Sequence, residues 1–186
     1  TVQWVMTGYL LAFTATIPLA GWAMDRYGAR RVWLLAVGVF TLGSLLCGAA
    51  WSAPSLIGFR VLQGAGAGLV SPVGIAMVAR AVGPQRMGRA MAVVGIPMML
   101  GPILGPVLGG VLIDSVDWRW IFLVNIPVGL ACLAWSVRAL ADTRGAGRER
   151  LDVLGLALLS PGLVALAYGV TALAGPTGSS AEAVAG

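Results

Sequence analysis

The chain has 186 residues, of which 59% are hydrophobic and only 10% are charged. Soluble domains carry roughly a quarter charged residues, so this composition excludes a water-soluble globular protein. The net charge of +5 comes from twelve arginines without lysine or histidine, and no basic–aromatic motif of the kind that reads nucleic acid is present, so we expect no nucleic-acid partner.

The sequence offers little for catalysis or metal binding. Cys47 and Cys132 lie within apolar runs, where we expect them to pack as small hydrophobic side chains. Because there is no histidine and no Cys-x-x-Cys pair, we predict neither a disulfide nor a metal site. No acid pair or serine–lysine pair occurs at membrane depth, so we expect no catalytic residues and no enzyme.

Several apolar runs are long enough to cross about 30 Å of hydrocarbon, which takes roughly 20 helical residues. They cover residues 2–21, 32–52, 55–80, 88–113, 119–141 and 153–174. The sequence therefore predicts an all-α membrane protein, a bundle of about six transmembrane helices. A charged connector is expected at 142–152 and a polar tail at 175–186.

Arginine placement predicts the orientation. The connections 24–31, 81–89 and 142–152, with the helix ends beside them, hold ten of the twelve arginines. By the positive-inside rule these loops are cytoplasmic, in a multi-pass protein of the cell membrane, and the 175–186 tail is extracytoplasmic. Tryptophans fall at the opposite predicted boundary, as an aromatic belt would, at Trp4, Trp51, Trp118 and Trp120.

A charged motif closes the first span. Its members are Gly21, Asp25, Arg26, Gly28, Arg30 and Arg31. An acid at a helix C-terminus opposes the helix dipole, so Asp25 is not there to stabilise its own helix. Gly28 suits a tight turn back into the membrane. For the arginines, setting the topology is an alternative role.

An arginine lies about a turn and a half inside the third span. Arg60 costs at least about 2.5–3.5 kcal/mol there unless it faces a partner or a water-filled cavity. Snorkelling to the outer interface is the alternative. Gln63 follows one turn later on the same face and extends the polar stripe. Gly64, Gly66 and Gly68 permit close helix packing.

The stretch 95–110 repeats glycine and proline at four-residue spacing. Its members are Gly95, Pro97, Gly101, Pro102, Gly105, Pro106, Gly109 and Gly110. In a soluble helix each internal proline would cost about 3 kcal/mol and each glycine about 1 kcal/mol. In a bilayer, glycine stripes instead let neighbouring helices approach closely. We therefore predict a bent, closely packed transmembrane helix that organises the rest of the chain.

Asn125 follows just inside the membrane after the aromatic segment Trp118–Trp120. An asparagine there is costly unless it is paired, so a role in a cavity is one interpretation.

These motifs, in this order, resemble the major facilitator superfamily, and specifically its fourteen-helix drug:proton antiporter branch. Residues 21–31 match the family's G-x-x-x-D-R-x-G-R-R loop, although Ala29 stands where arginine is frequent. Residues 60–67 match R-x-x-Q-G-x-G-A, and 95–110 approximates the antiporter motif. Residues 1–14 and 117–129 are also similar to this branch, and the resemblance covers about residues 1–175.

The resemblance implies a partial major facilitator fold that lacks the family's first helix and its C-terminal half. Residues 1–141 would be the second to sixth helices, and 153–174 a linker helix. It implies conformational gating by residues 21–31, with Asp25 docking on the other half. It also implies proton coupling at Arg60 and Gln63, with Asn125 beside the cavity, and a hinge and seal at 95–110.

The predicted function is proton-coupled efflux of drugs or other small amphipathic molecules, a multidrug-efflux and antibiotic-resistance role in a bacterium. The partners would be the lipid bilayer, the substrate, the proton and the missing half of the transporter, with no cofactor. Alone, the fragment should not transport. Because spans 32–52, 55–80 and 88–113 hold no acid, the titrating carboxylate is expected in an absent helix. A nutrient importer and a non-transporting scaffold or receptor are the alternatives.

Overall fold

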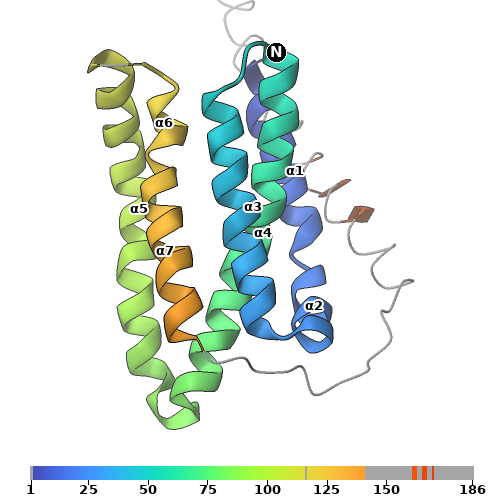
Figure 1. Ribbon diagram of the computed structural model, residues 1–186, viewed down its shortest axis with the longest axis vertical. Helices are drawn as coiled ribbons and strands as arrows, with labels where there is room; N and C mark the ends of the chain where they lie inside the picture. Colours follow the sequence, from blue (N-terminus) through green and yellow to red (C-terminus); the bar gives the residue numbers. More distant parts are fainter. Residues whose placement is uncertain (1, 116, 141–160, 163–164, 167–168, 170–186) are drawn as a thin grey trace, which may run out of the picture.

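The computed structural model describes residues 2–115 and 117–140, together with 161–162, 165–166 and 169. The described chain forms a bundle of helices that run up and down roughly side by side (Figure 1). In order, the elements are α1 (Val2–Thr16), α2 (Leu19–Tyr27), α3 (Ala29–Gly48), α4 (Ala53–Val82), the 3-10 turn η1 (Pro84–Arg86), α5 (Met87–Ser115), α6 (Trp120–Leu123) and α7 (Asn125–Ala139). The all-α prediction is confirmed.

The predicted spans correspond to these helices in order. Helices long and apolar enough to cross a membrane cover Ala29–Gly48, Ala53–Val82, Pro84–Gly105 and Trp120–Ala139, and α1 with α2 makes a fifth, bent candidate. The expected sixth span at 153–174, the connector at 142–152 and the tail at 175–186 lie outside the described residues, apart from isolated positions.

The first predicted span is broken at a proline, although the sequence analysis predicted a continuous helix there. Helix α1 ends at Thr16, α2 begins at Leu19, and the two are inclined by 53°. Pro18 has no N–H to continue the α1 ladder, which accounts for a break at this point. Helix α5 continues as one helix through the 95–110 stretch, and the bend predicted there stays a prediction.

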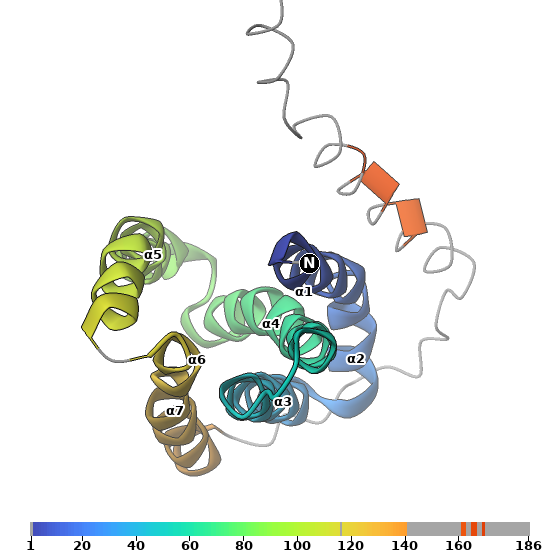
Figure 2. The same cartoon turned by 90° about the horizontal axis from the view of Figure 1, so that it is seen from above.

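Helix α4 is the centre of the described bundle, with α1 on one side and α3 on the other (Figure 2). Glycines make both contacts possible. A β-carbon on Gly64 or Gly68 would overlap the α1 backbone at Tyr9 or Phe13, and one on Gly66 would lie 2.6 Å from the backbone nitrogen of Phe40 in α3. The predicted close packing at these glycines is confirmed.

Helix α7 packs against α3 on the face away from α1 (Figure 2). Gly129 is buried, and a β-carbon there would overlap the side chain of Thr41. Lower down the same pair of helices, the indole N–H of Trp33 donates to Oγ of Ser136 at 2.9 Å. The polar link and the glycine contact together align α7 along α3.

Close packing at 95–110 is not what the described residues show. No described atom lies within 4 Å of a β-carbon built on Gly95, Gly101, Gly105 or Gly109. Helix α5 stands at one side of the bundle (Figure 2), and Ile103 and Val107 are mostly exposed. Within the described chain, α4 rather than α5 is the helix around which the others pack.

The turns at the basic end are shorter than predicted. Between α2 and α3 only Gly28 is non-helical, and its φ of 88° confirms the predicted glycine turn. Asp25 lies in the last turn of α2, at the helix C-terminus where it was expected. Gly83, with φ 69°, makes the corresponding turn after α4.

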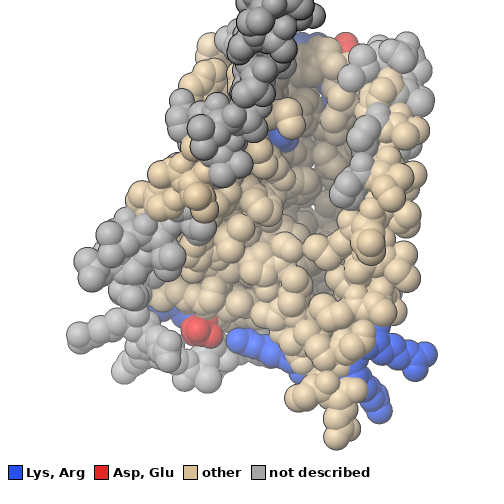
Figure 3. Space-filling view, turned by 180° about the vertical axis from the view of Figure 1, so that it is seen from behind, with Lys and Arg blue, Asp and Glu red and all other residues tan. Residues whose placement is uncertain are grey.

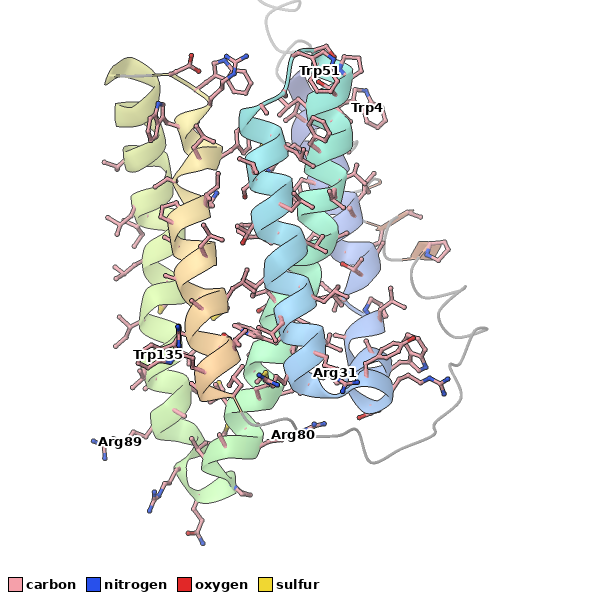
Figure 4. All side chains as sticks on the ribbon, viewed as in Figure 1. Trp4, Arg31, Trp51, Arg80, Arg89 and Trp135 are labelled. Carbon is pink, nitrogen blue, oxygen red and sulfur yellow. The ribbon has the colours of Figure 1, made fainter. Side chains whose placement is uncertain are left out.

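Basic residues gather at one end of the bundle, whereas tryptophans occur toward both ends, with Trp135 toward the basic end (Figure 4). Arg31, Arg80 and Arg89 project at one end, whereas Trp4 and Trp51 lie at the other (Figure 4). Seen from behind, the basic side chains gather at that same end, below a surface that is largely uncharged (Figure 3). This is the distribution that the alternating arginines predicted.

Candidate functional site

The best-defined polar site within the bundle is built around Arg60 of α4. Its Nη1 donates to Oε1 of Gln63 at 2.7 Å, and its Nε donates to the backbone carbonyl of Val5 in α1 at 3.4 Å. The guanidinium lies 4.0 Å from the ring centroid of Tyr9 and 5.6 Å from that of Phe122. The side chain thus points between α1 and α6 and is partly buried, so the expected facing toward partners is confirmed.

Gln63 carries the polar contacts from Arg60 into the centre of the bundle. It is only 2% exposed, and its Nε2 donates to Oγ of Ser44 in α3 at 2.5 Å. Cys47, also in α3, donates weakly from Sγ to Oε1 of Gln63 at 3.8 Å. Both ends of the amide are therefore satisfied, as a buried amide requires.

These contacts explain how a guanidinium is held at this depth. Within the described chain, its hydrogen-bonding partners are a carbonyl and an amide, and aromatic rings face it, so all are uncharged. A cation over an aromatic face gains about 0.5–2 kcal/mol, the larger value when it is desolvated. The site therefore stabilises the cation by hydrogen bonds and cation–π contacts.

Sequence reasoning found Arg60 and Gln63 but not their partners. Ser44 and Cys47 are three residues apart, so they share a face of α3, and both contact Gln63 of α4. This pair of small polar residues within the apolar span 32–52 is the signal in the sequence that indicates them. Tyr9 and Phe122 carry no such signal, because they reach Arg60 from other helices.

The charged motif at the basic end divides into two separate contacts. Oδ1 of Asp25 lies 3.8 Å from Nη2 of Arg80, which joins α2 to α4, and about half of each side chain is exposed. Arg30 instead donates from Nη2 to the carbonyl of Val137 at 2.8 Å, near the end of α7, while its Nε is buried without a hydrogen-bond partner among the described residues.

Three other members of this motif lie at the surface, whereas Gly28 is buried. Gly21 is exposed with no described atom near its missing β-carbon, and Arg26 and Arg31 are exposed. The structure thus shows Asp25 in contact with Arg80 of the same bundle, and its predicted docking on another half stays a prediction.

Asn125 is not brought into the Arg60 site within the described residues. Its Nδ2 donates to the carbonyl of Ile121, one turn earlier, at 3.3 Å. This contact lies within the α6–α7 pair, and the predicted cavity role of Asn125 stays a prediction.

An apolar cavity of about 410 Å³ lies between α3, α4 and α5. Its walls include Phe40 of α3, Val70 and Ser71 of α4, and Val94 and Met98 of α5. Small apolar ligands are generally held in such cavities, lined mainly by hydrophobic side chains with few polar groups. The start of the 95–110 stretch lines this cavity, and no described atom lies within 4 Å of a β-carbon built on the glycines further along it.

These features define a class of protein: a multi-pass integral membrane protein, here with a partly buried arginine held between its helices by uncharged partners. Comparison with known families and proteins makes this specific. Residues 1–181 match the model of the Major Facilitator Superfamily, and the chain belongs to this family of membrane transporters.

Relatives within the family carry multidrug resistance in their names. The chain is 54% identical to a multidrug resistance protein B homolog of Mycobacterium tuberculosis, over 90% of this chain and 31% of that protein. It is 38% identical to the protein named MdtD of Serratia proteamaculans, over 100% of this chain and 38% of that protein. The chain thus spans about a third of the length of the curated relatives it matches.

Proposed function

We propose that this chain forms part of a secondary transporter that exports drugs or other amphipathic molecules in exchange for protons, with no cofactor. The observation that carries the proposal is the Arg60 site. A charged side chain within a membrane span is costly, and such residues typically mark the pathway of a substrate, ion or proton. The names of the relatives support drug efflux, and the apolar cavity lined by Met98 would suit an amphipathic molecule.

In this mechanism Arg60 does not carry the proton. A guanidinium stays protonated at any physiological pH, so its role is to act on another group. The neutral neighbours of Arg60 leave its positive charge uncompensated. A carboxyl group brought close to Arg60 would therefore be stabilised in its ionised form. Proton release would then accompany the approach of that carboxylate, supplied by a helix outside the described residues.

The basic end would face the cytoplasm, and the end that carries Trp4 and Trp51 would face outward, by the positive-inside rule. The loops at 24–31, 81–89 and 142–152 would then be cytoplasmic, in the cell membrane. Asp25 would exchange its partner Arg80 for a helix N-terminus of the other half during gating, at little energetic cost, since the exposed pair is weak.

The open glycine face of α5 would receive that other half. Gly101, Gly105 and Gly109 leave a groove without side chains, so a facing helix could approach closely and seal the interface against proton leakage. The packing predicted for 95–110 would thus occur across the two halves.

Drug-stimulated proton flux tests the proposal, measured in proteoliposomes that contain the full-length transporter. We expect Arg60→Ala to abolish coupled flux, and Arg89→Ala to leave it unchanged as a matched control, because Arg89 is an exposed arginine on α5. Flux of unchanged size in Arg60→Ala would overturn the mechanism and favour a scaffold or receptor. Proton-driven accumulation of a nutrient would favour an importer.

A further inference from the structure

The guanidinium of Arg60 has hydrogen-bonding capacity that the described residues do not use. Its Nε donates to the carbonyl of Val5 and its Nη1 donates to Gln63, but Nη2 makes no hydrogen bond to a described residue. The rings of Tyr9 and Phe122 lie against the guanidinium, with its central carbon 4.0 Å and 5.6 Å from their centroids. Within the described chain, the edge that carries Nη2 is therefore open to a further acceptor.

No acid with a described side chain compensates the charge of Arg60. These acids are Asp25 and Asp117, which lie 3.8 Å and 3.7 Å from Arg80 and Arg119 and pair with them instead. A partly buried cation with an open edge favours an anion, and a carboxylate can accept two parallel N–H groups from a guanidinium. The charge and the shape of this edge thus fit a carboxylate.

The face of α4 that carries Arg60 continues into the apolar cavity between α3, α4 and α5. At about 3.6 residues per turn, positions 67, 71, 74 and 78 share a helix face with position 60. These positions hold Ala67, Ser71, Gly74 and Val78, and all of them line the cavity of about 410 Å³. At about 1.5 Å per residue, Ala67 lies about 10 Å further along the helix axis than Arg60. The open edge and the apolar cavity therefore follow one another along one face of α4.

We propose that this face of α4 binds an amphipathic organic anion, with a carboxylate on the open edge of Arg60 and an apolar body that reaches the cavity. This inference rests on the proposed function, because it names the class of molecule that the transporter would export. Among the described residues that line the cavity, Ser71 has the only polar side chain, so the charge of the ligand is recognised at Arg60. Met98 is a flexible side chain that adapts to apolar bodies of different shape.

A carboxylate at this edge can also come from an acid of the protein itself, which the proposed mechanism brings to Arg60. Nε and one N–H of Nη1 are already engaged, so substrate and protein acid would use the remaining edge in turn. An acid that held the edge permanently would exclude the substrate, and binding measurements separate the two cases.

The experiment measures binding of 6-phenylhexanoate and of its neutral amide, 6-phenylhexanamide, to the full-length transporter in neutral detergent at pH 7, by isothermal titration calorimetry. The two probes differ only in the group that would contact Arg60. We expect the wild type to bind the carboxylate about 10- to 100-fold more tightly, the factor that corresponds to a hydrogen bond with a charged group. Arg60→Gln should bind both probes equally, whereas Arg89→Gln, which removes an exposed arginine of α5, should keep the wild-type preference.

A second variant tests the apolar part and keeps Arg60, so it applies even if Arg60→Gln does not fold. Ser71→Leu fills part of the cavity and should weaken binding of both probes, with their ratio unchanged. Equal binding of the two probes by the wild type would overturn the proposal and indicate that an acid of the protein holds the edge. A preference that persists in Arg60→Gln, an equal loss of preference in Arg89→Gln, or unchanged binding in Ser71→Leu would each overturn it as well. None of these outcomes affects drug-stimulated proton flux, which tests the proposed function separately.

Discussion

The glycine contact between α4 and α3 gives a sharp test of which helix organises the bundle. A β-carbon at position 66 would lie 2.6 Å from the backbone nitrogen of Phe40 and 2.9 Å from the carbonyl oxygen of Ala36. Both are backbone atoms, so Gly66→Ala can be accommodated only if α3 and α4 move apart. Overpacking of this kind costs about 1–3 kcal/mol.

Gly58→Ala is the matched control on the same helix. Position 58 is exposed, with no described atom within 4 Å of the added β-carbon. Both substitutions gain the same helix propensity, at most about 1 kcal/mol, so the difference between them isolates the packing cost. We expect Gly66→Ala to be less stable than Gly58→Ala by about 1–3 kcal/mol.

The assay is reversible unfolding of the purified protein in mixed micelles titrated with dodecyl sulfate, followed by fluorescence of its seven tryptophans. The two variants are compared in the same titration, so that effects of the detergent cancel. Equal midpoints and slopes for Gly66→Ala and Gly58→Ala would refute the reasoning, because α3 and α4 could then not be in contact at this position.

Further predictions concern the polar contacts. Gln63→Leu should destabilise the protein by about 1–3 kcal/mol in the same unfolding assay, since it leaves Ser44 and Arg60 without their amide partner, and an unchanged midpoint would contradict the buried hydrogen bonds. Tyr9→Leu should cost about 0.5–2 kcal/mol through the lost cation–π contact, whereas Tyr9→Phe should stay near the wild-type value, and equal losses would show that the ring face is not responsible. Asp25→Asn should change stability by less than about 1 kcal/mol, with the difference vanishing at high salt, because the pair is half exposed; a larger, salt-resistant loss would indicate a buried interaction.

Signals that are local in sequence predicted much of this fold. Hydropathy located the five described spans, and alternating arginines placed Arg31, Arg80 and Arg89 at one end, because each needs only the residues nearby. The turn at Gly28 follows from a property of one residue. Arg60 and Gln63 were found together because a three-residue spacing shares a helix face.

What the sequence did not predict depends on which helices meet. Gly66 and Gly101 both belong to small-residue stripes, yet only the first packs closely in the described chain, since α4, unlike α5, has neighbouring helices on both sides. Prolines are similarly ambiguous, because Pro18 breaks a helix whereas Pro72 lies inside continuous α4. The structural effect of a glycine stripe or a proline therefore depends on its surroundings in the bundle, and neither motif specifies which helix lies next to it.

The Arg60 site also connects the elements that a transporter would have to move. Through Val5 and Tyr9 the guanidinium contacts α1, and through Gln63 and Ser44 it is linked to α3. A shift of α1 along α4 would separate Arg60 from its carbonyl and its aromatic ring at once, while the buried Gln63 contacts would stay in place. The cation would then need a new partner, and a carboxylate is the group that compensates it best. In the mechanism we propose, the contacts that hold Arg60 would therefore couple helix movement to the ionisation of an acid.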